Sequence, residues 1–588
     1  MSIVAEQSAD PSSRGLLSPA EPHRLLLVQR WWLRGGLFLL PFAYSFDTYD
    51  SYVLPKLLFA RLVVLGLLGF LVAIALTRGR LEIKRTRLDL PLLLFLVSAA
   101  ISTALAYNVN TAIFGTYSRY DGLLTTLTYV ALFWLAVQAL DGPGDARAML
   151  RVLLASGYVF ALLSIVQAIG DAASLRPVHP AWATVGNSNV AGAFLAMSAP
   201  LAAFELAGAT TWSGRLLAMN LLLALGVALA LTLSRSAWLG VAAAGIVLVA
   251  GWRGWVPRVA VAAAMVVTAA ALLLAGLQPG LSGQEHVVGQ RFASILNPAE
   301  LGSRPHIWQD SVRLIASRPL FGYGPDNFGL VYPNFQTGKW ETSNGVEVPI
   351  DKAHAETLQV AATQGLLGLV AYLAILVALA RSVWRSDRDD LQVAAFAVVV
   401  AYQVSLQLNF TALGAAFPYW IAVAAAVTLW NNPTARLAAT PRSKPTVRAT
   451  AGVSAIAIAA LAAGVVVLPY IADTRLRDAV GADFGGRGEA ARAAATQASA
   501  LVPYESVYQV EIGNVAFERG LWAEARPAYL SADRLGTYNP RVLRNLALAD
   551  RNLGLTAEAL AAARRALALD RFDPANQALV DQLLVGSP

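Results

Sequence analysis

The sequence predicts an all-α polytopic membrane protein with a long exterior loop and a C-terminal helical repeat domain. The chain of 588 residues is 56% hydrophobic and only 14% charged, whereas soluble globular proteins carry about 25% charged residues. Apolar stretches of about 20 residues, the length that spans a bilayer as a helix, recur along most of the chain. The residues after 470 show instead a repeating pattern of alanine, glycine and proline.

About thirteen apolar stretches have a length and composition suited to crossing a membrane as helices. The first and the eighth are short, and two near the end almost run together, so the count is good to within one. The first 34 residues form an N-terminal segment, and residues 35–470 form the membrane domain. The stretches lie near residues 35–46, 57–76, 89–106, 122–140, 149–169, 189–208, 216–233, 237–250, 258–278, 361–380, 391–409, 413–430 and 451–470.

The placement of basic residues indicates the orientation of the chain. One set of alternate loops, which includes the N-terminal segment, holds most of the lysine and arginine. Because loops retained in the cytoplasm are basic, we expect a cytoplasmic N-terminus, with a long loop at about 279–357 and the tail at 471–588 both exterior. The net charge of +8 then reflects topology, and no nucleic-acid partner is expected. The opposite short loops hold only Lys56, Arg119, Arg176 and Arg235.

The C-terminal tail repeats itself with a period of 34 residues. A shift of that length superposes Gly520 on Gly554 and Pro540 on Pro574. The period, with small residues where paired helices touch and proline at the turns, resembles the tetratricopeptide repeat. A degenerate earlier unit, at 486–503, is expected to cap the array. A packing or assembly scaffold is the favoured role, and a groove that binds a protein partner is the alternative.

Three arginines on the expected exterior side are candidate anion-binding residues. Arg235 lies in a short break between two apolar stretches, and Arg119 lies in an aromatic and glycine-rich turn. Arg304 opens a run within the long loop that ends at Trp308. Ionisable residues near membrane depth are usually functional, and a planar guanidinium suits phosphate oxygens. The alternative is an arginine that snorkels to lipid headgroups or pairs with a neighbouring carboxylate, as Arg119 can with Asp121.

His354 is the candidate general base. It precedes a run that continues without proline through Gly365 and Gly368 into an apolar stretch. We therefore expect the imidazole at the start of a helix, about two turns before the membrane, where it can take a proton from a substrate. A structural hydrogen-bonding role is the alternative. His354 and Glu356 point to different faces of a helix and no metal motif occurs, so no metal site is expected.

Other chemistries have no motif in the sequence. The chain contains no cysteine, which excludes disulfides, thiolate nucleophiles and cysteine-ligated metals. It has no phosphate-binding glycine loop, no nucleophile elbow and no dinucleotide-binding glycine pattern, so no cofactor is expected. The glycine-rich turn around Tyr323 has the composition of a loop-shaping segment.

Taken together, these segments resemble the O-antigen ligase and polymerase superfamily. The likeness covers about residues 30–430, and the repeat tail is similar to that of superfamily members that carry tetratricopeptide units. The motifs that carry it are the runs 304–308, 318–324 and 184–189, the turns 234–236 and 120–123, and His354 followed by Gly365 and Gly368.

The resemblance implies a bacterial inner-membrane enzyme that works without a metal or a nucleotide sugar. It would move a glycan from a polyprenyl diphosphate carrier to a hydroxyl acceptor on the exterior face, and in the ligase branch that acceptor is the lipid A core of lipopolysaccharide. By resemblance, His354 is the base that activates the acceptor, and Arg235 and Arg304 bind the diphosphate. The further residues expected to bind substrate are Arg119, Trp308, Asn187 and Tyr323.

Several related functions remain open at this point. Direct displacement at the anomeric carbon would invert its configuration, because no second nucleophile is evident. A polymerase that joins repeat units on the carrier, or an oligosaccharyltransferase with a protein Ser or Thr acceptor, differs only in an acceptor that the sequence does not report. A flippase for the lipid-linked glycan predicts ionisable residues in mid-span and inverted hydropathy repeats, and the sequence shows neither.

Overall fold

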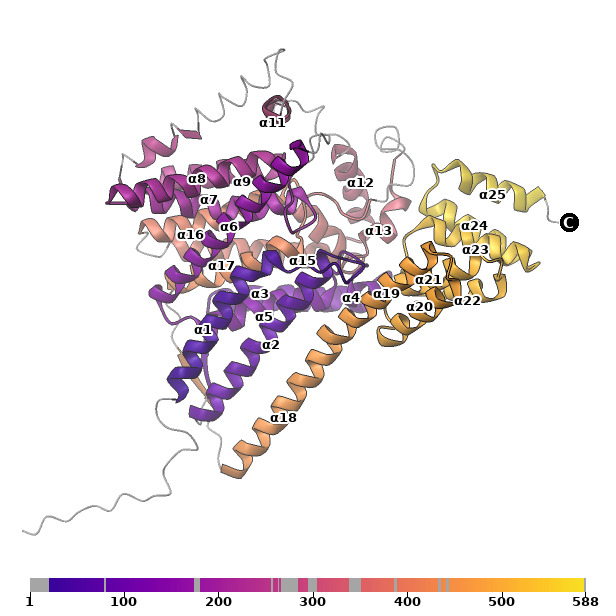
Figure 1. The fold of residues 1–588 in the computed structure, drawn as a ribbon, viewed down its shortest axis with the longest axis horizontal. Helices are drawn as coiled ribbons and strands as arrows, with labels where there is room; N and C mark the ends of the chain where they lie inside the picture. The colour runs from indigo at the N-terminus through magenta and orange to yellow at the C-terminus, as the bar shows by residue number, and fades with distance from the viewer. Residues whose placement is uncertain are drawn as a thin grey trace, which may run out of the picture.

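The computed structural model describes residues 21–78, 81–173, 180–254, 257–262, 264–265, 284–293, 304–337, 350–384, 389–431, 435–439 and 444–585. The described elements are almost all helices: a membrane bundle forms one part of the molecule and a helical repeat domain the other (Figure 1). The exception among them is a two-stranded antiparallel sheet of β1 (Leu81–Lys84) and β2 (Ala435–Ala439). The predicted all-α membrane fold is confirmed.

Within the described residues, seven helices are long and apolar enough to cross a membrane. Four shorter apolar helices accompany them, so the expected count of about thirteen is not reached in this part of the chain. The stretch near 258–278 and Arg176 lie mostly or wholly outside the described residues. The long helices are α2 (Val53–Arg78), α6 (Pro143–Ala173), α7 (Ser188–Gly208), α8 (Trp212–Leu231), α15 (Glu356–Trp384), α17 (Leu413–Asn431) and the span Val453–Phe484. The shorter ones are α3 (Asp89–Ala104), α5 (Leu123–Ala139), α9 (Arg235–Gly251) and α16 (Asp390–Leu406).

The first helix begins earlier than the sequence boundary at residue 35 suggested. Helix α1 runs over Glu21–Leu39 and is followed by a short 3-10 turn, Leu40–Phe42. Its polar residues are accommodated because Arg30 and Arg34 both form ion pairs with Asp145, at 3.0 Å each. Charge pairing with the start of α6 thus extends the helix into a segment that hydropathy alone excludes.

Close backbone approach holds the centre of the bundle together. Helix α16 packs against α7 and α9, α17 against α5 and α6, and α15 against α3. At the crossing of α9 and α16, a Cβ added to Gly240 would lie 2.3 Å from the carbonyl oxygen of Ala401. Small residues at helix contacts allow this approach, which is the usual way in which membrane helices associate.

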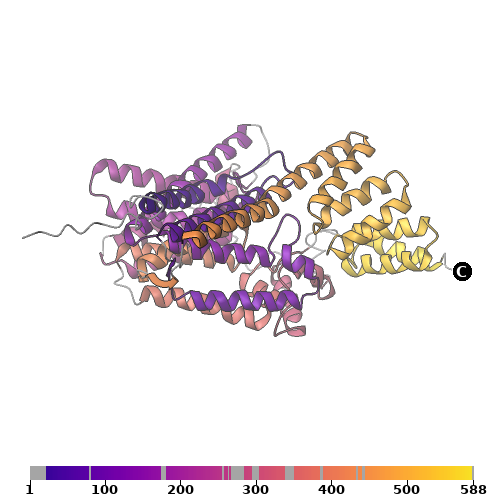
Figure 2. The ribbon, with the colours of Figure 1, turned by 90° about the horizontal axis from the view of Figure 1, so that it is seen from below.

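A long helical rod connects the bundle to the repeat domain (Figure 2). It consists of α18 (Lys444–Ala462), a π-helical turn (Ala463–Val467) and α19 (Leu468–Phe484), and it contacts α2 along its length. Its exposed apolar side chains, such as Val453 and Ile456, suit contact with lipid.

The repeat domain consists of three helix pairs whose starts are 34 residues apart. The first helices of the pairs begin at residues 488, 522 and 556, and the second helices at 506, 540 and 574. This confirms the predicted repeat, and the earlier unit forms a full pair. The helices are α20 (Gly488–Leu501), α21 (Ser506–Phe517), α22 (Trp522–Arg534), α23 (Pro540–Asn552), α24 (Thr556–Leu569) and α25 (Pro574–Val585).

The long loop contributes short helices at the end of the bundle near the repeat domain (Figure 1). They are α11 (Gln284–Ala293), α12 (Arg304–Ser317) and α13 (Phe328–Val331), and α4 (Val109–Phe114) lies between α3 and α5. The loop is joined to α15 at a break in that helix, where Gly365 has a φ of 68° and the N–H of Leu366 donates to Pro319 O at 2.7 Å. A Cβ at Gly365 would lie 2.3 Å from the backbone of Leu320.

We expect Gly365→Ala to destabilise the protein, because it adds left-handed strain of about 1–3 kcal/mol and a clash with the backbone of Leu320. The control is Gly69→Ala in α2, where an added Cβ meets nothing within 4 Å. Thermal unfolding of both variants in detergent, followed by fluorescence, should show a lower Tm for the first and an unchanged or raised Tm for the second. Equal midpoints would contradict the role of this glycine.

Candidate active site

Three arginines from separate elements gather at one end of the bundle. Arg235 is the first residue of α9, Arg304 is the first residue of α12, and Arg291 lies in the last turn of α11. Burial lowers the pKa of Arg304 to about 10, and the positive charges of Arg235 and Arg291 add to that effect. Like charges that depress one another's pKa lie close together. We call Arg235, Arg291 and Arg304 the arginine cluster.

A strained turn between α8 and α9 places Arg235 in this cluster. Leu233 has a φ of 53°, which is unusual for a residue other than glycine. The hydroxyl of Ser234 donates to the side chain of Asn189 at 2.9 Å and lies 3.1 Å from the hydroxyl of Ser236. These bonds fix the turn, and Arg235 is only 8% exposed. The short sequence break therefore folds as a rigid support for a buried cation.

His354 lies in a bend before α15, and not in the helix as the sequence analysis expected. The helix begins at Glu356, and His354 has a φ of 52°. The reason is local: the N–H of Ala353 donates to the side chain of Gln359 at 2.8 Å, which turns the chain before the helix starts. The imidazole packs edge-on against Phe410, with ring centroids 5.4 Å apart.

The surroundings of His354 keep its imidazole neutral. Burial is the largest cause of a pKa lowered to about 4, the charges of Arg304 and Arg119 lower it further, and Asp351 opposes them. The Nδ1 atom is buried and has no hydrogen-bond partner among the described residues. At pH 7 the ring is therefore unprotonated, as a general base must be.

Arg119 forms an ion pair, although not with its neighbour Asp121. Its Nε lies 2.5 Å from the carboxylate of Asp351, and its guanidinium lies 5.2 Å from the centre of the Phe410 ring. The aromatic ring of Phe410 is thus flanked by Arg119 and His354. The charges of Arg119 and Arg304 both act on His354, so the three residues belong to one site. A contact between Arg119 and the substrate stays a prediction.

A buried ion network, missed by the sequence analysis, holds the segment before His354. The ammonium group of Lys352 lies 2.8 Å from both Asp121 and Asp326, and its side chain is 1% exposed. Asp326 also accepts from the N–H and the hydroxyl of Thr116 at 2.7 and 2.9 Å. The network joins three turns that are far apart in the sequence. The available signal was an adjacent Asp351 and Lys352 between the apolar residues Ile350 and Ala353.

Two further predicted residues have structural partners. The side-chain oxygen of Asn187 accepts from the N–H groups of Asn189 and Val190, which makes Asn187 the N-cap of α7. It also lines a cavity of about 240 Å³ together with Arg119 and Lys352. The hydroxyl of Tyr323 lies 2.8 Å from that of Ser317.

Trp308 lies one turn after Arg304 on α12, so both side chains share a face of the helix. Its indole N–H is buried and finds no hydrogen-bond partner among the described residues. Such an N–H usually has a partner when buried, so a ligand oxygen would complete it. Within the described chain, no group of three or more His, Asp or Glu side chains is arranged to hold a metal ion.

Comparison with known families bears directly on this end of the molecule. Residues 218–373 match the sequence model of the O-antigen ligase family. This segment of the chain is similar to that family. It contains Arg235, Arg304 and His354 as well as the residues between them. The apolar helices of the described residues suit a multi-pass membrane protein, and the matched segment is similar to an O-antigen ligase domain.

Solved structures with some likeness include the Arabidopsis OM64 TPR domain, at 18% identity and a TM-score of 0.20, covering 20% of this chain and 99% of that one. Another is the APC/C hetero-tetramer Cut9-Hcn1, at 11% identity and a TM-score of 0.19, covering 79% of this chain and 91% of that one. Scores this low carry no argument, so the repeat assignment rests on the 34-residue period of the helices themselves. No curated protein matches the chain.

We expect Lys352→Met to destabilise the protein by about 3–5 kcal/mol, because it leaves two buried carboxylates without their cation. The matched control is Arg475→Met, which breaks an exposed ion pair with Asp478 and should cost about 0–1 kcal/mol. Thermal unfolding in detergent measures both. A Lys352→Met protein as stable as the control would contradict the importance of the network.

Proposed function

We propose that the chain transfers a glycan from a polyprenyl diphosphate carrier to a hydroxyl acceptor, as an O-antigen ligase does. In this proposal Arg235 and Arg304, with Arg291 beside them, bind the diphosphate, and His354 is the base. The observation that carries it is a cluster of like-charged arginines next to an imidazole that stays neutral. Several cations held at one end of the bundle favour the binding of an anion.

The chemistry needs little beyond these groups. The acceptor oxygen bonds to the anomeric carbon, the bond from that carbon to the carrier diphosphate breaks, and the acceptor proton moves to His354. Fixed cations stabilise the negative charge that develops on the departing diphosphate. The indole N–H of Trp308, which lacks a partner among the described residues, is placed to donate to a donor oxygen. A single displacement of this kind inverts the anomeric configuration.

Donor binding is expected to prepare the base. Arg304 and Arg119 depress the pKa of His354, which makes it a weak base. A bound diphosphate places negative charge near the same arginines and raises that pKa, because an opposite charge favours the protonated form. His354 thus becomes a stronger base when the donor is in place, and the acceptor is activated only when the transfer can follow.

The arrangement of the helices supports an exterior site at the bacterial inner membrane. Helices α2, α9 and α15 begin at the end of the bundle that holds the arginine cluster and His354. At their other ends, α2 finishes at Arg78, α9 finishes two residues before Arg253, and α15 has Arg381 in its last turn. The basic residues therefore gather at the end of the bundle away from the site. Because basic ends are retained in the cytoplasm, we place the candidate active site on the exterior side.

The bonding of a buried lysine argues against a flippase. It is the one lysine buried within a long span of the described residues. Lys56 in α2 donates to the carbonyl oxygens of Ala43, Tyr52 and Thr184 at 2.9, 3.0 and 2.5 Å. Its three protons are all used by the protein, which marks a structural group and not a transport site. A polymerase or a protein O-oligosaccharyltransferase uses the same donor chemistry and differs in its acceptor.

We expect His354→Ala to lower turnover about 10²–10⁴-fold, the usual value of an oriented general base. The assay reconstitutes the purified protein with a polyprenyl diphosphate glycan and candidate acceptors, and it follows glycosylated product together with released carrier. His23→Ala is the control, because His23 is exposed on the first turns of α1. Turnover within a few-fold of wild type in the His354 variant would overturn the assignment of the base, and movement of intact carrier without product would support a flippase.

The pH dependence of transfer should report the influence of Arg304 on the base. A base must be unprotonated, so kcat/KM falls as the pH drops through the pKa of His354, which is about 4 in the free protein. Arg304→Gln removes a positive charge that depresses this pKa, so the acidic limb of the profile should move to higher pH. Arg313→Gln on the same helix removes an exposed charge paired with Asp310 and should leave the limb in place. An unmoved limb in Arg304→Gln would show that this arginine does not act on His354.

A further inference from the structure

The repeat domain is fixed to the membrane domain beside the turn that carries Arg119. The side-chain amide of Asn110 donates to the carbonyl oxygens of Tyr504 and Leu535, at 2.9 Å each. The rings of Phe114 and Tyr504 stack with centroids 3.7 Å apart. These contacts involve specific polar groups and an aromatic stack, so the two parts meet in one defined arrangement.

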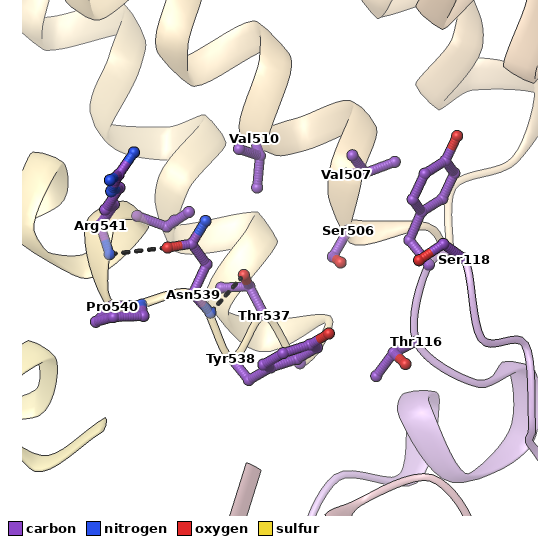
Figure 3. A pocket seen from close by; sticks show the side chains of 13 residues that line it. Thr116, Ser118, Ser506, Val507, Val510, Thr537, Tyr538, Asn539, Pro540 and Arg541 are labelled. Carbon is purple, nitrogen blue, oxygen red and sulfur yellow. Dashed lines mark hydrogen bonds between the residues drawn. The ribbon is translucent and has the colours of Figure 1, made fainter. Parts of the chain in front are cut away.

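A cavity of about 490 Å³ lies at this junction. One wall is the turn that holds Thr116 and Ser118, and the other is formed by the start of α21 and the loop that leads into α23 (Figure 3). Figure 3 shows Ser506, from the repeat domain, beside Ser118 of the turn, with the hydroxyl of Tyr538 directed toward Thr116. The volume falls within the range of about 300–1,000 Å³ that is typical of small-molecule sites.

The lining of the cavity has the chemistry of a saccharide site. Hydroxyl groups from both walls face it, and the ring of Tyr538 offers an apolar surface that ends in a further hydroxyl. Val507 and Val510 add apolar contact from α21. Arg541 is the one charged residue among the described residues that line it. A neutral lining with many hydroxyls suits a sugar and does not suit a diphosphate, which needs several cations.

The cavity adjoins the candidate active site through Tyr538. This side chain packs against an apolar cluster that includes Ile350 and Ala353, from the segment that carries His354. Burial raises the pKa of Tyr538 to about 12, and the nearby charges of Asp351, Asp326, Arg119 and Lys352 all act on it. Tyr538 therefore lies beside the same ion pairs that hold the bend of His354.

We propose that this cavity is the acceptor subsite, and that the repeat domain supplies half of its wall to a saccharide acceptor. The inference rests on the proposed function and deepens it, since it names the acceptor class as a glycan. The donor diphosphate is held by the arginine cluster of the membrane domain, and the acceptor sugar is held at the junction with the repeat domain. Asp351 and Arg119 act on both Tyr538 at the cavity and His354, and in this proposal the acceptor hydroxyl reaches His354 from the cavity.

Filling the cavity should weaken acceptor binding and leave donor binding intact. Ser506→Trp places a large side chain in the cavity from the repeat side, and Ala490→Trp adds the same bulk at an exposed position of α20 as the control. With the full chain in detergent, the acceptor KM for a lipid-linked core oligosaccharide and for a lipid-linked repeat unit should rise at least tenfold in Ser506→Trp. The donor KM should stay within about threefold, and Ala490→Trp should match wild type.

If Ser506→Trp does not fold, a smaller substitution tests the same cavity. Tyr538→Phe removes one hydroxyl and keeps the ring, so the acceptor KM should rise roughly three- to tenfold, the effect of one hydrogen bond. An unchanged acceptor KM in whichever of these variants is folded would overturn the subsite. Transfer by the wild type to a Ser or Thr peptide, with none to either saccharide, would overturn the acceptor class.

Calorimetric titration with the core oligosaccharide freed of its lipid separates this inference from the proposed function, because it needs no turnover. His354→Ala should bind the oligosaccharide as wild type does, whereas Ser506→Trp should not. Oligosaccharide binding that Ser506→Trp abolishes, in a protein that transfers no glycan, would support the cavity as a saccharide site and refute the transfer. Binding that Ser506→Trp leaves unchanged would refute the cavity alone.

Discussion

The candidate active site depends on one buried lysine. Lys352 neutralises two carboxylates, Asp121 and Asp326, that belong to turns on either side of it in space. A buried cation of this kind adds little net stability, but removal of either partner leaves an uncompensated charge, so the arrangement is strongly specified. Asp351, next to it, is held by Arg119. Asp351 and Lys352, which precede the bend at His354, are thus both held by ion pairs.

The positively and the negatively charged side chains around His354 belong to different elements of the structure. The arginine cluster of Arg235, Arg291 and Arg304 is built from α9, α11 and α12, whereas the carboxylates of the ion network belong to the turns that face the repeat domain. The cavity beyond those turns is nearly uncharged. A donor that carries a diphosphate and an acceptor that carries only hydroxyls would therefore be sorted to different sides of the base. Exchange of the two substrates would place a diphosphate near buried carboxylates, which electrostatics opposes.

The sequence predicted the parts of the protein that local patterns determine. Apolar stretches and a 34-residue period are repeated signals, and Arg235, Arg304 and His354 stand out because ionisable residues are rare near apolar helices. The ion network could not be predicted, because Asp121 and Lys352 are 231 residues apart and meet only in the fold. For the same reason Asp121 was considered as the partner of Arg119, which pairs instead with Asp351. The break at Gly365 depends on contacts with the segment of Pro319 and Leu320, and sequence periodicity does not record these.

The rod of α18 and α19 gives the repeat domain a function that a detached scaffold would not have. Asp473 on this rod accepts a hydrogen bond from the hydroxyl of Tyr117 at 2.6 Å and another from the N–H of Asp50 at 2.9 Å. The rod therefore contacts the aromatic turn in addition to the amide contacts that Asn110 makes with the repeat domain. A wall held from two directions is preorganised, and a preorganised site loses less entropy when it binds a flexible saccharide. A domain that only recruited partners would need one flexible attachment, so the double attachment favours a part in the chemistry at the membrane surface.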